Sequence, residues 1–165
     1  MAKHSSGYTS VQVSLHWLIV LLVLFQLVFG EDMGRYNYFV RSGQDATPLL
    51  TGYYLHLSVG IAVLVLTLMR LGLRLTLGVP QSVPGPALQV KAGEALHYLF
   101  YVLLILTPIT GLLAQYVNMR TFGEIHAANK PAFIVLILVH AAAALYHHFV
   151  LKDSTLRRMM VPGTH

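Results

Sequence analysis

Four long apolar segments, each close to the length that crosses a lipid bilayer, constrain this chain more than any other feature. They run over about residues 11–29, 49–71, 95–117 and 131–151. A helix needs about 20 mostly apolar residues to span the hydrocarbon core of a membrane. Because the connections between the segments are short, the sequence predicts an all-α integral membrane protein, an antiparallel four-helix bundle.

The composition agrees with a membrane location. Hydrophobic residues make up 56% of the 165 residues and charged residues only 10%, whereas soluble domains carry about 25% charged residues. An ordinary soluble enzyme, a disordered tail and a disulfide-stapled secreted module are therefore excluded. The chain has no cysteine, which excludes thiolate metal sites, iron–sulfur clusters and haem attached through Cys-x-x-Cys-His. No internal repeat is visible, so residues 1–165 are expected to form a single domain.

The Lys and Arg residues indicate an orientation in the membrane. They do not gather on one basic face, so a nucleic-acid partner is not expected. If the N-terminus is inside, the inner residues are Lys3, Arg70, Arg74, Lys91, Lys152, Arg157 and Arg158. The outer residues are then Arg35, Arg41, Arg120 and Lys130. Cytoplasmic loops are enriched in Lys and Arg, so both termini are expected to be cytoplasmic.

Histidine is unusually abundant for a lipid-embedded chain. The nine histidines outnumber the six acidic residues. His4 and His165 lie on the tails, and the others lie within or beside the apolar segments. Any single histidine at a helix end could simply be hydrated, but His140 has apolar neighbours on both sides and needs a hydrogen-bond partner or a metal. Imidazole suits haem iron, where it serves as an axial ligand.

Spacing along the chain extends this interpretation to two haems. His126 and His140 are 14 residues apart, nearly four helical turns, which would put both on one helix face about 21 Å apart. The second ligands would come from other helices, with His56 at the outer depth and His16 at the inner depth. Iron held by two imidazoles has no open position and carries electrons.

Spacing alone leaves two alternatives open. Pro131 is a natural first-turn residue, so the fourth helix could begin there and leave His126 in a loop. His147 lies on the same helix face as His140 and nearer the depth expected for His16, so either histidine could ligate the inner iron.

Three more residues are candidate neighbours of a haem. Gly60, one turn after His56, would let a flat ring approach closely, although small residues are also common where membrane helices pack. Arg70 and Arg74, one turn apart, could hold haem propionates through charge-assisted hydrogen bonds. Anchoring at the inner membrane surface accounts for the same two arginines.

Several stretches resemble the bacterial diheme cytochrome b561 family of small four-helix inner-membrane proteins. They are residues 14–18 (SLHWL), 56–60 (HLSVG), 123–126 (GEIH) and, most specifically, 140–149 (HAAAALYHHF) continuing to residue 160. The likeness covers essentially the whole chain. It implies location in the bacterial inner membrane and helices over about residues 11–29, 49–73, 93–117 and 122–151, with Pro131 inside the last helix.

The resemblance also implies the cofactors and the residues around them. Two non-covalent b haems would have four axial ligands in the bundle core: His16, His56, His126 and His140. Three inner-side histidines would be left for quinone binding and proton donation: His97, His147 and His148. The family passes electrons between the outer surface and membrane quinone, and one branch oxidises superoxide outside while reducing ubiquinone.

A physical argument supports and limits the superoxide interpretation. Two one-electron centres suit a one-electron donor and a two-electron acceptor, and the outer cations could attract an anionic radical. The outer acids cancel these cations, however: Glu31, Asp32, Asp45 and Glu124. The outer segments therefore form no simple basic funnel for superoxide, a departure that concerns the substrate and not the haems. On the resemblance, we expect a quinone-linked diheme oxidoreductase that uses superoxide.

Two further functions stay open from the residues. The first is a b-type electron-carrier subunit for a periplasmic dehydrogenase or hydrogenase. The second is a haem-free transporter with a proton relay, for which Pro108 and Gly111 would suit a broken helix, although such proteins usually contain an internal repeat.

Overall fold

The helices follow the chain order that the apolar segments predict, with additional short helices between and after them. The computed structural model describes residues 7–117 and 120–163 and contains no strand in these ranges. Its elements are α1 (Ser10–Phe29), α2 (Glu31–Arg41), the 3-10 turn η1 (Thr47–Leu49), α3 (Leu50–Leu77), α4 (Ala87–Tyr116), α5 (Arg120–Phe149) and α6 (Arg157–Met160). Lys3, His4 and His165, assigned above to the tails, lie outside the described residues.

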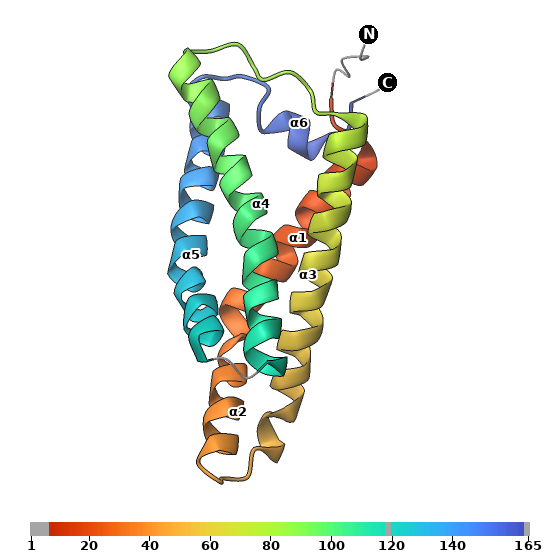
Figure 1. Cartoon of the computed structure of the whole chain (residues 1–165). Coiled ribbons are helices and arrows are strands. Elements are labelled where there is room, and N and C mark those ends of the chain that lie inside the picture. The colour runs from red at the N-terminus through yellow and green to blue at the C-terminus, as the bar shows by residue number, and fades with distance from the viewer. Residues whose placement is uncertain (1–6, 118–119, 164–165) are drawn as a thin grey trace.

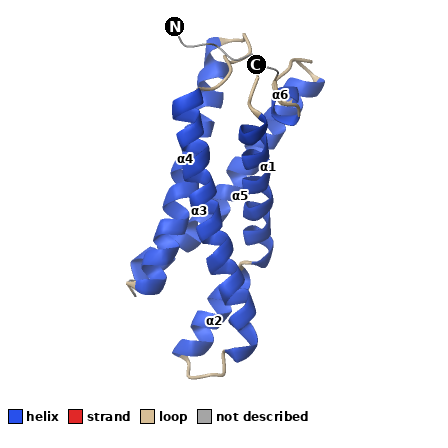
Figure 2. Cartoon of the chain, turned by 90° about the vertical axis from the view of Figure 1, so that its right-hand side faces the viewer, coloured by secondary structure: helices blue, strands red, loops and turns tan. Residues whose placement is uncertain are grey.

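Four of these segments are long and apolar enough to cross a membrane. They are Ser10–Phe29, Thr47–Leu77, Ala87–Tyr116 and Arg120–Phe149, with 20, 31, 30 and 30 residues. Figures 1 and 2 show them running lengthwise along the molecule, and α1 packs against α3, α3 against α4 and α4 against α5. The predicted all-α class and its four candidate spans are confirmed.

The two ends of the bundle carry different elements (Figure 1). One end, called the α2 end here, carries α2, the end of α4 and the start of α5. The other, called the α6 end, carries α6 and residues 78–86. Two hydrogen bonds tie α6 down: Trp17 donates its indole N–H to the Met159 carbonyl at 2.8 Å, and Arg158 donates to the Gln81 carbonyl at 2.7 Å.

Proline has opposite effects in two parts of the chain. Between α3 and α4, Gly78 has φ 75° and three prolines follow within residues 80–86, so no helix forms there. Pro108 and Pro131, by contrast, lie inside α4 and α5, and both helices continue through them. His126 is therefore helical, and α4 is not the broken helix that the transporter alternative requires.

Helices α3 and α4 extend beyond the predicted apolar segments, because hydropathy detects only the part of a helix that lies in lipid. α4 begins at Ala87, before the predicted 93, and α3 ends at Leu77, after the predicted 73. At 1.5 Å per residue, a 30-residue helix is about 45 Å long and exceeds a hydrocarbon core of about 30 Å. The helix Glu31–Arg41, which the sequence analysis did not predict, is polar and lies between two spans.

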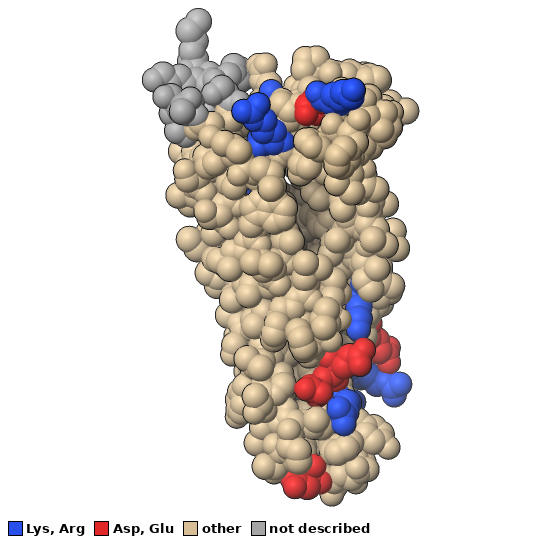
Figure 3. Space-filling view, turned by 180° about the vertical axis from the view of Figure 1, so that it is seen from behind, with Lys and Arg blue, Asp and Glu red and all other residues tan. Residues whose placement is uncertain are grey.

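Few apolar side chains are buried inside the bundle. In the part of the chain that the structure describes, the buried hydrophobic residues are Val13, Leu15, Ile19, Leu49, Val63 and Phe133. Many large apolar residues face outward instead, and charged side chains on the face in Figure 3 gather toward the two ends of the molecule. The apolar surface thus suits lipid, and histidines and cavities occupy much of the interior.

Candidate functional site

The bundle brings histidines from different helices together at two depths. Near the α2 end, His56 of α3 faces His126 of α5, with ring centroids 5.8 Å apart. Nearer the α6 end, His16 of α1 faces His140 of α5, with ring centroids 6.4 Å apart. The two α5 members are separated by 14 residues, or about 21 Å along the helix axis.

Both separations fit two imidazoles on opposite sides of one iron. Metal–imidazole bonds of about 2 Å on each side would put the ring centroids about 6 Å apart. The described residues contain no group of three or more His, Asp or Glu side chains that could hold a metal ion by themselves. A pair of imidazoles suits an iron whose other four ligands come from a porphyrin.

His126 is held by the backbone of α4. Its Nδ1–H donates to the Thr107 carbonyl at 2.8 Å, which leaves Nε2 free to bind a metal, the arrangement usual for metal-binding histidines. Gly111 lies against the same ring, because a Cβ added there would be 2.9 Å from it. The sequence analysis placed Pro108 and Gly111 in a broken helix and did not connect them with His126.

His56 has a different environment. Among the described residues, its Nδ1 is buried without a hydrogen-bond partner, as are Oε1 of Gln26 and Oγ1 of Thr107. The Gln26 amide donates to the His56 carbonyl at 2.7 Å, and a Cβ on Gly30 would be 3.1 Å from the His56 Nδ1. Buried polar atoms without a partner cost about 1–3 kcal/mol each, so this region fits a ligand or water that can hydrogen-bond.

A cavity of about 1070 Å³ connects these residues. Residues from α1 to α5 line it, among them His56, His126, Gly60 and Gly111. Cofactor and ligand sites commonly measure about 300–1,000 Å³, so the cavity has room for a large flat group. Gly60, predicted to neighbour a haem, would place a Cβ 3.4 Å from the Gln26 amide nitrogen.

The charges that line the cavity at the α2 end are mostly paired. They are Glu31, Arg41, Arg120, Glu124 and Lys130. Lys130 lies 3.4 Å from Glu31, and Arg120 lies 2.8 Å from Glu124. Arg41 donates its Nε–H to a backbone carbonyl of α2 and has no carboxylate within 4.0 Å among the described residues. One unpaired cation therefore remains at an otherwise neutral mouth.

The other charged residues predicted for this end do not line the cavity. Arg35 lies 3.4 Å from Asp32 on α2. Asp45 lies before η1, where its Oδ1 accepts the backbone N–H of Thr47 at 2.9 Å. Hydrogen bonds from the side chain and the backbone of Thr47 hold the pKa of Asp45 below its ordinary value.

At the α6 end, His140 contacts three aromatic rings. Besides His16, the rings of His97 and Phe100 in α4 lie with their centroids 5.4 Å from that of His140. His97 is exposed, whereas His16 and His140 are half-buried. The structure therefore brings His140, and not His147, against His16, and it adds His97 to the same cluster.

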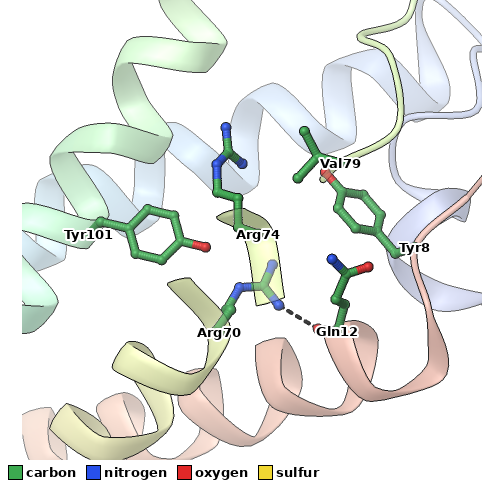
Figure 4. Close-up of a pocket in the computed structure, with 6 residues that line it drawn as sticks. All are labelled: Tyr8, Gln12, Arg70, Arg74, Val79 and Tyr101. Carbon is green, nitrogen blue, oxygen red and sulfur yellow. Dashed lines mark hydrogen bonds between the residues drawn. The ribbon is translucent and has the colours of Figure 1, made fainter. Parts of the chain in front are cut away.

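Arg70 and Arg74 lie on α3, and Figure 4 shows both side chains in a pocket with Tyr8, Gln12 and Tyr101. Arg70 donates a hydrogen bond to the carbonyl of Gln12, one turn before His16. The guanidinium of Arg74 lies 5.6 Å and 5.9 Å from the ring centroids of Tyr98 and Tyr101. These cation–π contacts fix Arg74 between α3 and α4.

The two guanidinium groups form a candidate anion site. Both side chains are half-buried, and neither has a carboxylate within 4.0 Å in the described ranges. Tyr8 and Tyr101 complete the pocket around them, but its volume is about 10 Å³, roughly the room of one water molecule. A carboxylate would therefore bind beside the pocket, against the guanidinium groups, where charge-assisted hydrogen bonds are strong.

The last two predicted residues, His147 and His148, have different surroundings. His148 is exposed, and its ring centroid lies 4.8 Å from that of Phe149. His147 is half-buried, and its Nδ1 lies 2.5 Å from Oδ2 of Asp153. Asp153 was not predicted from the sequence as a functional residue, and no spacing rule connects it with His147.

A bundle of four candidate membrane spans, with imidazoles paired in its interior and no thiolate in the chain, is the architecture of a membrane b-type cytochrome. The family described as prokaryotic cytochrome b561 matches residues 7–162. The chain belongs to this family. It is therefore a bacterial membrane electron carrier that works with haem b.

Three relatives document the likeness. The chain is 46% identical to cytochrome b562 of Cereibacter sphaeroides, over 94% of this chain and 96% of the relative. It is 34% identical to the probable superoxide oxidase CybB of Yersinia pestis, over 93% and 95%. It is 27% identical to cytochrome b561 homolog 1 of Escherichia coli, over 93% and 96%.

Proposed function

We propose that this chain is a diheme oxidoreductase of the bacterial inner membrane that carries electrons from superoxide, at the α2 end, to ubiquinone, at the α6 end. The observation that supports this proposal most strongly is the presence of two imidazole pairs at two depths, each with a centroid separation near 6 Å. Two one-electron centres across a membrane suit transfer from one surface to the other.

The axial ligands follow from the pairs. His56 and His126 hold one haem, His16 and His140 hold the other, and His97 lies beside the second pair. Arg70 and Arg74 bind propionates of the haem nearer the α6 end. When bound, each haem supplies a one-electron redox centre, and the side chains around it fix its orientation and limit access of water.

The orientation follows from the positive charges. Arg70, Arg74, Lys152, Arg157 and Arg158 all lie toward the α6 end, which makes this end cytoplasmic under the positive-inside rule. Both termini are then cytoplasmic, and the cavity beside α2 opens to the periplasm.

Superoxide as the donor is supported by the relative whose name is probable superoxide oxidase CybB and by Arg41 at the cavity. Superoxide gives up one electron and leaves as dioxygen, so no proton is needed at this end. The second candidate, a carrier subunit for a periplasmic dehydrogenase or hydrogenase, needs the same haems but a protein donor. The charges at the mouth are mostly paired and form no strongly basic funnel for an anion. This favours keeping the carrier subunit as a second candidate.

Quinone reduction at the α6 end needs two electrons and two protons. Two superoxide molecules would supply the two electrons, one each, and the haems held by the two histidine pairs would conduct them. His147 donates the protons, because it is half-buried at the end of α5 on the same face as His140, seven residues away. His148 is exposed and contributes less.

Stopped-flow spectroscopy of the purified protein tests the proposal. We expect two haems per chain, rapid haem reduction by superoxide, and reoxidation of the haems when ubiquinone is added. A haem spectrum that superoxide does not change would favour the carrier subunit. One haem per chain would contradict the two-site assignment.

A further inference from the structure

The turn that follows α5 folds back on the helix in an unusual conformation. Lys152 has φ 53°, and it is the one non-glycine residue with positive φ among residues 7–117 and 120–163. This left-handed conformation is uncommon for residues other than glycine, asparagine and aspartate. The reversal lets the Asp153 amide donate to the His147 carbonyl at 3.1 Å. The backbone of the turn therefore returns the chain to the last turn of α5.

Both carboxylate oxygens of Asp153 have fixed partners. Oδ2 lies 2.5 Å from Nδ1 of His147, and Oδ1 accepts the backbone N–H of Thr155 at 2.8 Å. Thr155 Oγ1 also lies 3.5 Å from the same imidazole nitrogen. The exposed fractions of the Asp153 and His147 side chains are 17% and 28%. Asp153 therefore cannot rotate away without losing two hydrogen bonds.

The hydrogen bonds decide the protonation of this pair. Burial raises the pKa of Asp153, but hydrogen bonds from His147 and Thr155 outweigh it, and the net pKa lies below the ordinary value. At neutral pH the carboxylate is ionised and can only accept, so Nδ1 of His147 carries the hydrogen. The other ring nitrogen, Nε2, is then the atom left to exchange a proton.

The charged surroundings of His147 are simple. Among the described residues, Asp153 is the one carboxylate within 4.0 Å of its ring nitrogens. Tyr146, with a ring centroid 6.3 Å away, is a titratable neighbour on α5. From α6, Arg158 is directed to the Gln81 carbonyl.

Asp45 shows what this kind of turn looks like without a histidine. Its Oδ1 accepts the N–H of Thr47 at 2.9 Å, the same contact that Asp153 makes with Thr155 two residues later. Asp45 is exposed and contacts no imidazole in the described structure. The turn alone therefore does not explain the contact of Asp153 with His147.

We propose that Asp153 is a positioning residue for proton delivery to the quinone, acting through His147. This inference rests on the proposed function, in which His147 donates the protons. The Nε2–H bond of the imidazolium would break as an O–H bond forms on the quinone oxygen, and bound haems would supply the electrons. The neutral imidazole would keep its hydrogen on Nδ1, hydrogen-bonded to Asp153, and would take a new proton at Nε2 from water. Two such cycles convert one quinone to quinol.

The test compares three variants of the full-length, haem-loaded protein: Asp153→Asn, His147→Phe and Asp45→Asn. Asparagine can still accept the Thr155 N–H through its Oδ1, so D153N keeps the turn. It removes the negative charge and puts an N–H donor where Oδ2 accepts from His147. We expect D153N to slow haem-to-ubiquinone electron transfer about 10–100-fold, the usual effect of removing the partner that orients a functional histidine. D45N, the matched control, leaves this rate unchanged.

Two readouts separate positioning from a merely structural role. Haem content and haem reduction by superoxide stay at wild-type values in D153N. The solvent deuterium isotope effect on quinone reduction increases in D153N, because proton delivery becomes the slow step when the donor is no longer oriented. Loss of haem, or a slower rate with an unchanged isotope effect, would show that Asp153 is only structural and overturn the proposal.

His147→Phe distinguishes failure of this inference from failure of the proposed function. If H147F reduces quinone slowly while D153N matches the wild type, Asp153 has no positioning role but the proton-donor assignment stands. If H147F itself matches the wild type with an intact haem spectrum, the assignment of His147 fails and the inference fails with it.

Discussion

The two ends of the bundle hold histidine pairs of similar spacing in very different surroundings. At the α2 end, His126 is bonded to a backbone carbonyl, a large cavity surrounds the pair, and four of the five charges that line it are paired. At the α6 end, Arg70 and Arg74 have no carboxylate within 4.0 Å among the described residues, and His147 is hydrogen-bonded to Asp153. Similar histidine pairs therefore lie in surroundings suited to different tasks: the α2 end to admit a small solute, and the α6 end to bind anions and exchange protons.

Removing one axial ligand should have the largest effect and tests whether the two pairs are independent. Under the proposed ligand assignment, we expect His126→Phe to remove the haem of the α2 end alone, and His140→Phe to remove the haem of the α6 end alone, because each iron would lose one of its two protein ligands. Haem content per chain, measured as the pyridine adduct, should fall by half in each variant.

His97 provides the control for that experiment. Its ring lies 5.4 Å from that of His140, compared with 6.4 Å for His16. We expect His97→Phe to keep both haems. If H97F loses a haem and His16→Phe does not, the ligand of the α6-end haem is His97.

Substituting Gly111 is a smaller change that should weaken haem binding at the α2 end alone and leaves every candidate ligand in place. A Cβ at this position would lie 2.9 Å from the His126 ring, so Gly111→Ala should displace the imidazole and weaken haem binding at the α2 end about 10-fold or more. Gly72→Ala, where a Cβ would meet nothing within 4 Å, is the matched control. Haem retention during gel filtration measures the difference, and equal retention in the two variants would contradict the assigned contact.

The arginines should affect the α6 end alone. Arg70→Gln removes a positive charge that stabilises the reduced form of the nearby haem, so its midpoint potential should fall by about 30–60 mV, or about 1 kcal/mol for one electron. The haem of the α2 end should not change. Arg35→Gln, at an ion pair of the α2 end, is the control, and a potentiometric titration that finds no shift in R70Q would place the propionates elsewhere.

The smallest effect concerns stability and compares the two aspartates. The pKa of Asp153 is lowered in the folded protein, below an unfolded value of about 4. The carboxylate therefore stabilises the fold at pH above about 4, and this contribution disappears as the pH falls through the folded pKa. Thermal unfolding from pH 6 to pH 3 should show a smaller pH dependence in Asp153→Asn than in the wild type. D45N should change it less, and an equal change would mean that the bond to His147 adds nothing.

Much of the fold could be predicted from the sequence, since lipid imposes a length and a polarity on every segment that crosses it. The helix ends and α2 could not, because hydropathy says nothing about helical residues outside the lipid. The candidate ligands could be predicted from the sequence for a similar reason. A buried imidazole needs a partner, and a separation of 14 residues puts His126 and His140 on one face.

The residues that surround these histidines could not be predicted from the sequence in the same way. Gly111 matters because α4 and α5 pack closely at His126. Gln26 matters because its amide, on α1, donates to the His56 carbonyl on α3. Asp153 meets His147 only because Lys152 takes a left-handed conformation. Each of these contacts depends on a crossing, a rotamer or one backbone angle, which no residue pattern encodes by itself.

The sequence by itself determined that this is a membrane-embedded helical bundle with imidazoles that need partners, because burial in lipid penalises polar groups wherever they lie along a helix. Only the tertiary structure decided which imidazoles face one another, which charges cancel and which aspartate reaches a histidine. Those outcomes depend on distances of a few ångströms between residues that are far apart in the chain, and such distances are set when the helices pack.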